Sequence, residues 1–369
     1  MYYNSMNSTD VVPYKKTGFD SNKYIELQSN AIKERVGKFH KGKLYLEIGG
    51  KFLFDPHAQR VLPGFNPYSK VLIFKHLDIN FDLIFCINAK DIVGNRMLSN
   101  KWISYMDYVL QMLKDFEDTL GKKPQISINL ISKENESLIE EAIKRLEKLD
   151  YKISKRYQIE GYPKSNKVLS KQGYGTDDYI HTESNLVLVV GAASNSGKMS
   201  TCLGQIYLDS LNGKDSGYAK YETFPIWNLE LNHPINLAYE AATIDIGDYN
   251  VIDAYHKDSY GIDAVNYNRD VDAFVIVEEL AWQFLPEDNF VRSYKSPTDM
   301  GISKAGFAIT DDSVVSIAAY REILRRKGWY EQMIARGEGD AVWIKKIEKL
   351  EVKAMKYIDD KGYDINIEI

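Results

Sequence analysis

Apolar positions along this chain follow two patterns, a helical spacing of three to four residues and short uninterrupted aliphatic runs. In the first half, the helical spacing predicts helices over 22–39, 69–77, 103–120 and 134–149. The apolar runs between them predict strands over 43–48, 81–87, 125–131 and 151–157. Strands that alternate with helices imply crossover connections and a parallel sheet. Residues 19–157 are therefore predicted to form a doubly wound α/β domain.

The same alternation resumes in the second half of the chain. A strand is predicted over 186–190 and another from residue 218, with helices from residue 198 and over 235–242, 269–284, 312–325 and 340–358. Between the halves, residues 158–184 are rich in Gly, Tyr, Lys and Asp and have no period. We expect a linker or a loop over a site there.

The predicted fold class is α/β, with two Rossmann-like or P-loop-like three-layer αβα units, mostly parallel sheets and a C-terminal helical extension. The second unit covers 185–326 and the extension covers 327–369. The length of 369 residues agrees with two units, because domains commonly have about 100–200 residues.

The stretch from Leu186 to Thr201 predicts a phosphate-binding loop. An apolar strand leads into a loop without bulky side chains, and a helix begins at Lys198. A P-loop has this order, because loop and helix amides, a lysine and a hydroxyl act together on phosphates and Mg²⁺. The predicted cofactor-binding residues are Gly191, Ser194, Asn195, Ser196, Gly197, Lys198, Met199, Ser200 and Thr201.

The loop departs from the standard pattern Gly-x4-Gly-Lys-Ser/Thr, which would require a glycine at 192 and a hydroxyl at 199. The metal-binding hydroxyl is consequently either Ser200 or Thr201, and Asp245 is the carboxylate predicted to join it. A Gly/Ser turn that merely connects a strand to a helix is the alternative interpretation.

Further charged residues are candidates for chemistry. Lys220 and Glu222 are expected at the carboxyl edge of the sheet, and with Lys198 they form the predicted catalytic set. Each carboxylate could instead be a solvated surface charge or a helix cap. The predicted substrate-binding residues are Lys51, His57, Arg60, Asn268, Arg269 and Asp299.

Composition limits the partners. The formal net charge of −5 argues against a protein that binds nucleic acid through phosphate contacts. Two cysteines suggest a reducing cytosol, and no apolar run approaches the roughly 18 residues of a membrane span. The absence of His/Cys ligand spacing argues against zinc. We expect a cytoplasmic homo-oligomer that acts on a small-molecule substrate, without nucleic-acid or membrane partners.

Several long phrases resemble a bacterial family catalogued as domain of unknown function 1846, over residues 19 to 326. They are 43–51 (KLYLEIGGK), 57–64 (HAQRVLPG), 196–203 (SGKMSTCL), 217–228 (GYAKYETFPIWN), 233–243 (HPINLAYEAAT), 264–270 (AVNYNRD) and 296–301 (SPTDMG). The resemblance implies a loop richer in Gly and Pro than the one with Ala192, Ala193 and Asn195. It also implies that the family's usual C-terminal domain is replaced here by charged helices.

A second, local resemblance is to dethiobiotin synthetase-type P-loop enzymes. In these enzymes a lysine follows Gly-Tyr-x on the strand after the P-loop helix, and the segment 217–220 (GYAK) matches that position. The resemblance implies that Lys198 and Lys220 both contact ATP phosphates. It also implies that a phosphorylated acid or carbamate is attacked by an amine.

The leading hypothesis is an ATP- and Mg²⁺-dependent ligase or phosphotransferase acting on a small carboxylate or amine between the two units. The alternative is a regulatory module that binds a nucleotide or phosphorylated metabolite without turnover.

Overall fold

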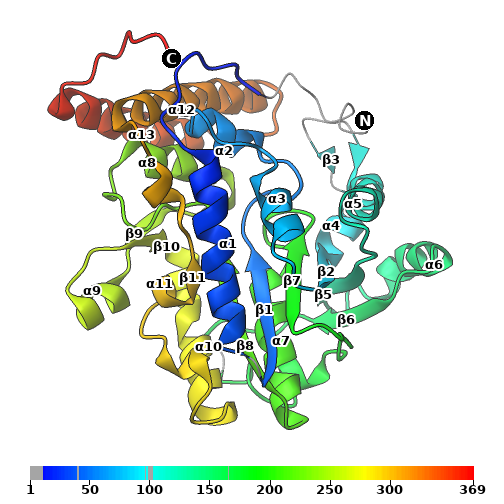
Figure 1. Cartoon of the computed structure of the whole chain (residues 1–369). Coiled ribbons are helices and arrows are strands. Elements are labelled where there is room, and N and C mark those ends of the chain that lie inside the picture. The colour runs from blue at the N-terminus through cyan, green and yellow to red at the C-terminus, as the bar shows by residue number, and fades with distance from the viewer. Residues whose placement is uncertain (1–10, 40, 96, 99–102, 165) are drawn as a thin grey trace.

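One seven-stranded sheet runs through the molecule and contains strands from both halves of the chain (Figure 1). The computed structural model describes residues 11–369 apart from 40, 96, 99–102 and 165. All neighbouring strands in this sheet are parallel. From edge to edge the strands are β11 (Gly301–Ile302), β8 (Asp215–Tyr221), β1 (Gly42–Ile48), β7 (Leu186–Gly191), β2 (Phe81–Asn88), β5 (Gln125–Ile131) and β6 (Ile153–Tyr157).

The described structure also contains α-helices, short 3₁₀ helices and two small antiparallel strand pairs. The helices of the first half are α1 (Ser21–Gly37), α2 (Pro56–Val61), α3 (Ser69–His76), α4 (Ala89–Val93), α5 (Tyr105–Leu120) and α6 (Glu140–Lys148). Those of the second half are α7 (Lys198–Leu211), α8 (Pro234–Ala241), α9 (Ala254–Tyr260), α10 (Asn268–Phe284), α11 (Pro297–Met300), α12 (Asp312–Ala335) and α13 (Ala341–Lys361). The small antiparallel pairs are β3 (Met97–Leu98) with β4 (Ile103–Ser104), and β9 (Asn250–Ile252) with β10 (Val265–Tyr267).

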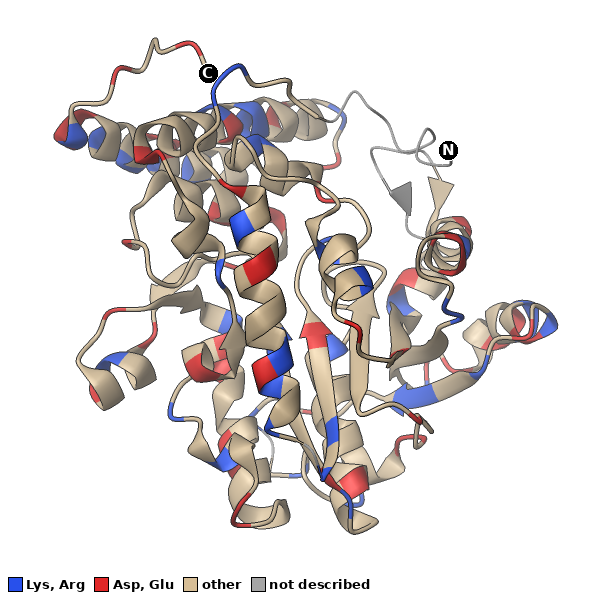
Figure 2. Ribbon diagram, viewed as in Figure 1, with Lys and Arg blue, Asp and Glu red and all other residues tan. Residues whose placement is uncertain are grey.

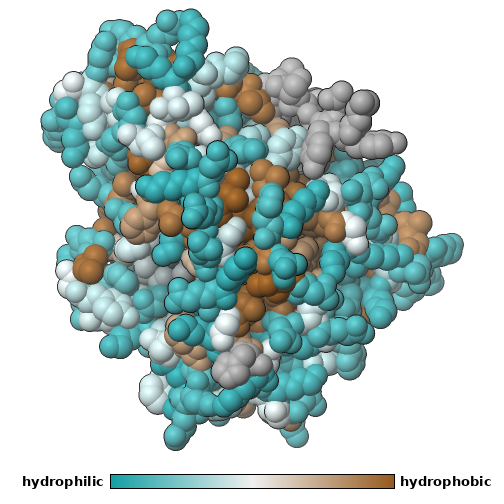
Figure 3. Space-filling model, in the orientation of Figure 1, coloured by the Kyte–Doolittle hydropathy of each residue, from teal (hydrophilic) through white to brown (hydrophobic). Residues whose placement is uncertain are grey.

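The central strands are buried on both faces, which explains their uninterrupted apolar sequences. Helix α1 crosses in front of the sheet beside α3, while α7 packs behind β1, β7 and β8 with α10 against it (Figure 1). The predicted α/β class with a parallel sheet is confirmed. The face seen in Figure 3 is mainly hydrophilic, with hydrophobic residues gathered near its centre.

The sheet does not follow the predicted division into two units. Strand β1 belongs to residues 19–157, yet it pairs with β7 on one side and with β8 on the other. The alternation of strands and helices predicts which segments are strands, but it leaves their lateral order open. Whether 19–157 and 185–326 fold independently stays a prediction, as does the role of 158–184 as a linker or site loop.

The C-terminal helices α12 and α13 pack against α2 and α8. Helix α12 contacts both of these helices and α13. It runs unbroken through residue 327, where the extension was predicted to begin. Figure 2 shows acidic and basic residues interspersed along α12 and α13. None of the helices in the described part of the chain has the length and apolar content that a membrane crossing requires.

We predict that Leu188→Ala lowers the free energy of unfolding by roughly 2–5 kcal/mol, since it opens a cavity in the middle of the sheet. Leu188 is fully buried and lies in register between Leu46 and Leu83. Urea unfolding followed by far-UV circular dichroism and tryptophan fluorescence should give coincident curves. Val352→Ala, at a side chain that is 70% exposed, should change stability by less than about 0.5 kcal/mol. Two separate transitions would contradict a single cooperative sheet.

Candidate functional site

A cavity of about 120 Å³ lies at the carboxyl edge of the sheet, where β1, β7 and β8 end. Ligands of open parallel α/β sheets bind at this edge. Its lining residues come from the ends of strands β1 and β8 and the segments after them, the loop after β7 with the start of α7, helix α3, and the segments around α8 and α10. They are Glu47, Gly49, Gly50, Lys70, Ser194, Lys198, Lys220, Glu222, Thr223, Phe224, Tyr239, Thr243, Ile246, Asp248, Tyr267 and Arg269.

Two asparagines on neighbouring strands hold the loop between β7 and α7. Asn88 and Asn129 are register partners on β2 and β5. The Nδ2 group of Asn88 donates to the carbonyl of Asn195 at 3.2 Å, and that of Asn129 donates to the carbonyl of Ser196 at 2.7 Å. In a trans peptide the next N–H points opposite to the carbonyl. The amides of Ser196 and Gly197 consequently point away from β2 and β5.

Close packing explains why positions 191 and 197 are glycines. Gly197 has φ +82°, and a Cβ there would lie 2.9 Å from Asn129 Cβ. A Cβ at Gly191 would lie 2.0 Å from the Oγ of Ser196, a buried hydroxyl without a partner among the described residues. Gly197 also leaves the first turn of α7 without a side-chain cap. An uncapped helix N-terminus beside a loop of small residues fits a phosphate group.

The two predicted phosphate lysines line the same cavity. Lys198 begins α7, and its Nζ lies 3.7 Å from Glu47 Oε1. Lys220 is on β8, where its Nζ lies 2.6 Å from Glu222 Oε1 and donates to Asp270. Glu47 is the register partner of Lys220, and β1 thus places a carboxylate between the two ammonium groups.

Burial controls the protonation of the Lys220–Glu222 pair. Burial raises the pKa of Glu222 to about 7; the Lys220 ammonium opposes this rise, and the carboxylates of Asp270 and Glu47 add to it. Burial alone would lower the pKa of Lys220, but Asp270 and Glu222 outweigh it and raise that pKa. Glu222 can therefore exchange a proton near neutral pH while Lys220 stays charged.

Arg269 connects the loop to the opposite wall of the cavity. Its Nη1 donates to the side-chain oxygen of Asn195 at 2.6 Å, and its Nη2 lies 2.9 Å from Asp248 Oδ2. The guanidinium is partly exposed. Its predicted contact with an anionic ligand stays a prediction. Asn268, the preceding residue, instead accepts a hydrogen bond from the Tyr249 amide and lies outside the lining.

The predicted metal ligands are not assembled in the cavity. Thr201 is buried, and the single proton of its hydroxyl is shared between two acceptors, Asn129 Oδ1 at 3.1 Å and the Gly197 carbonyl at 3.0 Å. Ser200 is not a lining residue, and Asp245 is exposed and accepts from the Tyr330 hydroxyl. Over the described residues, no group of three His, Cys, Asp or Glu could hold a metal ion. Ser200, Thr201 and Asp245 in these positions do not fit a shared Mg²⁺ site.

The other four predicted substrate-binding residues also lie outside the lining. Lys51 is exposed, and its carbonyl accepts from the buried Lys70 ammonium. Arg60 is half-buried, with its Nε 3.0 Å from Glu322 Oε2. Asp299 is on α11, where it accepts from the Tyr260 hydroxyl and from the backbone N–H of Lys295.

His57 lies behind the cavity wall, where its ring meets Tyr239 edge-on at 4.7 Å. Both ring nitrogens are buried without a hydrogen-bond partner among the described residues, and Nδ1 lies 3.5 Å from Glu322 Oε1. Burial lowers the pKa of His57 to about 3, although the Glu322 carboxylate opposes this. The imidazole is neutral at pH 7 and joins α2 to α12.

Sequence reasoning missed several cavity residues. Glu47, Lys70, Tyr239 and Tyr267 line the cavity but carry no local motif for catalysis. Glu47 had a usable signal, because it lies near the end of the strand predicted over 43–48, which Gly49 and Gly50 follow. That signal points to a ligand-binding site only once β1 is known to lie beside β7, the strand that leads into the loop.

Comparison with known proteins gives a family but no activity. The family model described as "Domain of unknown function DUF1846, N-terminal" matches residues 17–367. A UPF0371 protein of Streptococcus uberis is 41% identical over 342 residues, covering 92% of this chain and 67% of the relative. UPF0371 proteins of Corynebacterium aurimucosum and Corynebacterium diphtheriae are 45% and 43% identical, each covering 84% of this chain and 61% of the relative. The chain thus spans less than two thirds of the Corynebacterium relatives.

These matches confirm the resemblance to domain of unknown function 1846. The local likeness to dethiobiotin synthetase-type enzymes and the statement about a missing C-terminal domain stay predictions.

We predict that His57 makes the fold sensitive to acid. The unfolded histidine takes up a proton below about pH 6.5, whereas the folded one does so only near pH 3, so stability falls as the pH decreases through this window. At pH 5 this loss amounts to about 2 kcal/mol. The free energy of unfolding, measured in urea, should therefore fall between pH 7 and pH 5 by about 2 kcal/mol less in His57→Leu than in the parent.

The exposed His76 provides the control for this measurement. His76→Gln should keep the acid sensitivity of the parent. An unchanged pH dependence in His57→Leu would refute the assignment.

Proposed function

The chain belongs to the DUF1846 family, whose name assigns no activity, and we propose that it is an ATP-dependent ligase or phosphotransferase. The proposed substrate is a small carboxylate or amine. One observation carries the proposal: the loop after β7, Lys198, Lys220 and Glu222 meet at a single cavity on the carboxyl edge of the sheet.

The loop and Lys198 are proposed to bind the phosphates of ATP. The amides of Ser196 and Gly197 and the start of α7 offer positive partial charge. Lys198 would leave Glu47 and contact a phosphate oxygen, an exchange that its 3.7 Å separation from Glu47 makes easy. The mobile charge of a lysine on a flexible stem suits this exchange.

Glu222 is proposed to accept a proton during the reaction. In the ligase version, the substrate carboxylate attacks the terminal phosphorus of ATP and ADP leaves. An amine then attacks the acyl carbon, phosphate leaves, and the amine proton passes to Glu222. Lys220, fixed by Asp270, would stabilise the negative charge that develops beside it.

Mg²⁺ is expected to accompany ATP, but no step is assigned to it. Neither Ser200, Thr201 nor Asp245 lines the cavity, so these residues offer it no shared site.

A regulatory module that binds a nucleotide without turnover is the second candidate. One observation favours it: Lys198, Lys220 and Arg269 each already face a carboxylate. This pairing weakens the electrostatic stabilisation that the three cations could give to a reacting phosphoryl group. This candidate predicts saturable binding without ADP formation from any mixture of acids and amines.

We predict that ATP raises the melting temperature of the parent by mass action, and that Lys198→Ala weakens ATP binding roughly 10- to 100-fold. Thermal shift and calorimetric titration measure both effects. Lys349→Ala, at an exposed lysine on α13, should bind ATP as the parent does. Absence of an ATP shift, or parent-like binding by Lys198→Ala, would refute the phosphate site.

We predict that ADP formation from ATP rises with pH through about 7, because only ionised Glu222 accepts a proton. Glu222→Gln should lower this rate by roughly 100- to 10,000-fold and leave ATP affinity within about threefold. Glu279→Gln, at an exposed glutamate on α10, is the matched control. ATP binding without ADP formation at any pH would favour the regulatory module instead.

A further inference from the structure

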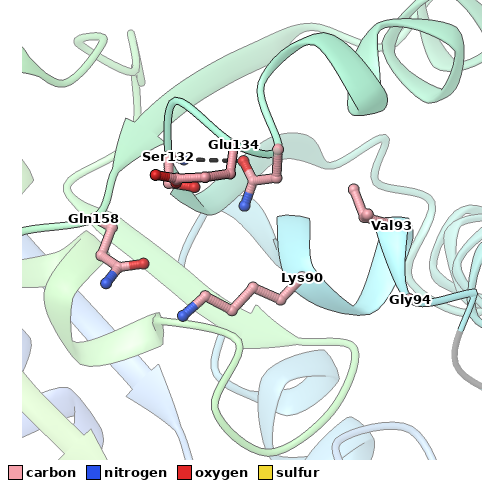
Figure 4. A pocket seen from close by; sticks show the side chains of 7 residues that line it. Lys90, Val93, Gly94, Ser132, Glu134 and Gln158 are labelled. Carbon is pink, nitrogen blue, oxygen red and sulfur yellow. Dashed lines mark hydrogen bonds between the residues drawn. The ribbon is translucent and has the colours of Figure 1, made fainter.

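A second and larger cavity opens at the same edge of the sheet, where β2, β5 and β6 end. It has a volume of about 460 Å³ (Figure 4). Lys90, Val93 and Gly94 line it from α4 and its end, Ser132, Glu134 and Asn135 from the turn after β5, and Gln158 from the residue after β6. None of these residues belongs to the site described above.

Size separates the roles of the two cavities. Sites for small molecules commonly measure about 300–1,000 Å³. The first cavity, at about 120 Å³, is too small for a whole nucleotide, although it suits a phosphate group. The second cavity falls within the common range and can accept a nucleoside-sized group.

The loop after β7 lies between the two cavities. Strand β7 separates β1 and β8, which end at the first cavity, from β2, β5 and β6, which end at the second. Asn88 holds the loop and stands two residues before Lys90, and Asn129 holds it from β5. The two cavities therefore flank the loop, with the first on the side of β1 and β8 and the second on the side of β2, β5 and β6.

The turn after β5 is shaped by internal hydrogen bonds. Leu130 has φ +61°, an uncommon conformation for a branched residue. The buried Asn135 side chain accepts from the Ser132 amide at 2.9 Å and donates to the Leu130 carbonyl at 3.1 Å. The turn thus presents Ser132 and Glu134 from a fixed backbone.

The lining suits an uncharged polar ring. In Figure 4 the Lys90 ammonium and the Gln158 amide extend toward each other beneath the turn. The described residues hold no ion-pair partner for Lys90, and Glu134 offers an exposed carboxylate across the cavity. A cation and an anion in one small site oppose a strongly charged ligand, whereas a ring with both donors and acceptors can bond to each. Val93, which is 38% exposed, adds an apolar surface to the lining.

We propose that this second cavity binds the heterocyclic base and ribose of the nucleotide whose phosphates lie on the loop. Lys90 and Gln158 are the residues that recognise the base. This inference rests on the proposed function and deepens it by assigning the nucleoside part of ATP to a site beyond the loop.

The test compares ATP with inorganic tripolyphosphate, which has phosphates and no nucleoside, by calorimetric titration of the full chain. We expect Lys90→Ala and Gln158→Ala to weaken ATP binding about tenfold each and to leave tripolyphosphate binding unchanged. Lys198→Ala should weaken both ligands. Lys133→Ala, an exposed lysine in the same turn that does not line the cavity, should bind both as the parent does.

The outcomes separate this inference from the proposed function. If ATP binding depends on Lys198 but is parent-like in Lys90→Ala and Gln158→Ala, the nucleoside site is refuted and the phosphate site stands. If tripolyphosphate binds as tightly as ATP, the second cavity contributes nothing and the inference fails. If neither ligand binds the parent, both proposals fail. Lys90 and Gln158 are exposed, so their replacement should leave the fold intact.

Discussion

Strand β1 pairs in parallel with β7 on one side and with β8 on the other, and the candidate site depends on this arrangement. The carboxyl ends of three strands from distant parts of the chain meet at one edge. Glu47 then stands between Lys198, which follows β7, and Lys220, which is carried by β8. Without β1 in this place, β7 and β8 would not lie on either side of Glu47, and the cavity would lose one wall.

Charge pairing governs what can enter this cavity. Lys198 faces Glu47, Lys220 faces Glu222 and Asp270, and Arg269 faces Asp248. A phosphate bound as proposed would have to replace a carboxylate at one of these cations. Lys198 and Arg269 are the most accessible of the three, whereas Lys220 is enclosed between two carboxylates. This division suits exchange at the loop and electrostatic support beside Glu222.

The aromatic wall of the cavity connects the site to the C-terminal helices. Phe224 and Tyr239 stack with ring centroids 3.7 Å apart, and both line the cavity. His57 touches the back of Tyr239, and Glu322 of α12 touches His57. Burial alone would raise the pKa of Glu322, but Arg325, His57 and Arg60 lower it to about 2. The helices beyond residue 311 therefore support the wall through a charged cluster, although they supply no residue to the cavity itself.

The sequence by itself determined the strands and helices around the site and the order of strand, small-residue loop and helix at 186–198, because apolar periodicity and glycine placement are local properties. It also identified Lys220, Glu222 and Arg269, which follow or begin recognisable elements. Tertiary structure alone decided that β1 lies between β7 and β8, that Asn88 and Asn129 hold the loop, and that Asp248 replaces Asp245 at the cavity. These outcomes depend on the lateral order of strands and on side-chain direction, which arise from contacts between residues far apart in the chain and leave no signature in the local pattern.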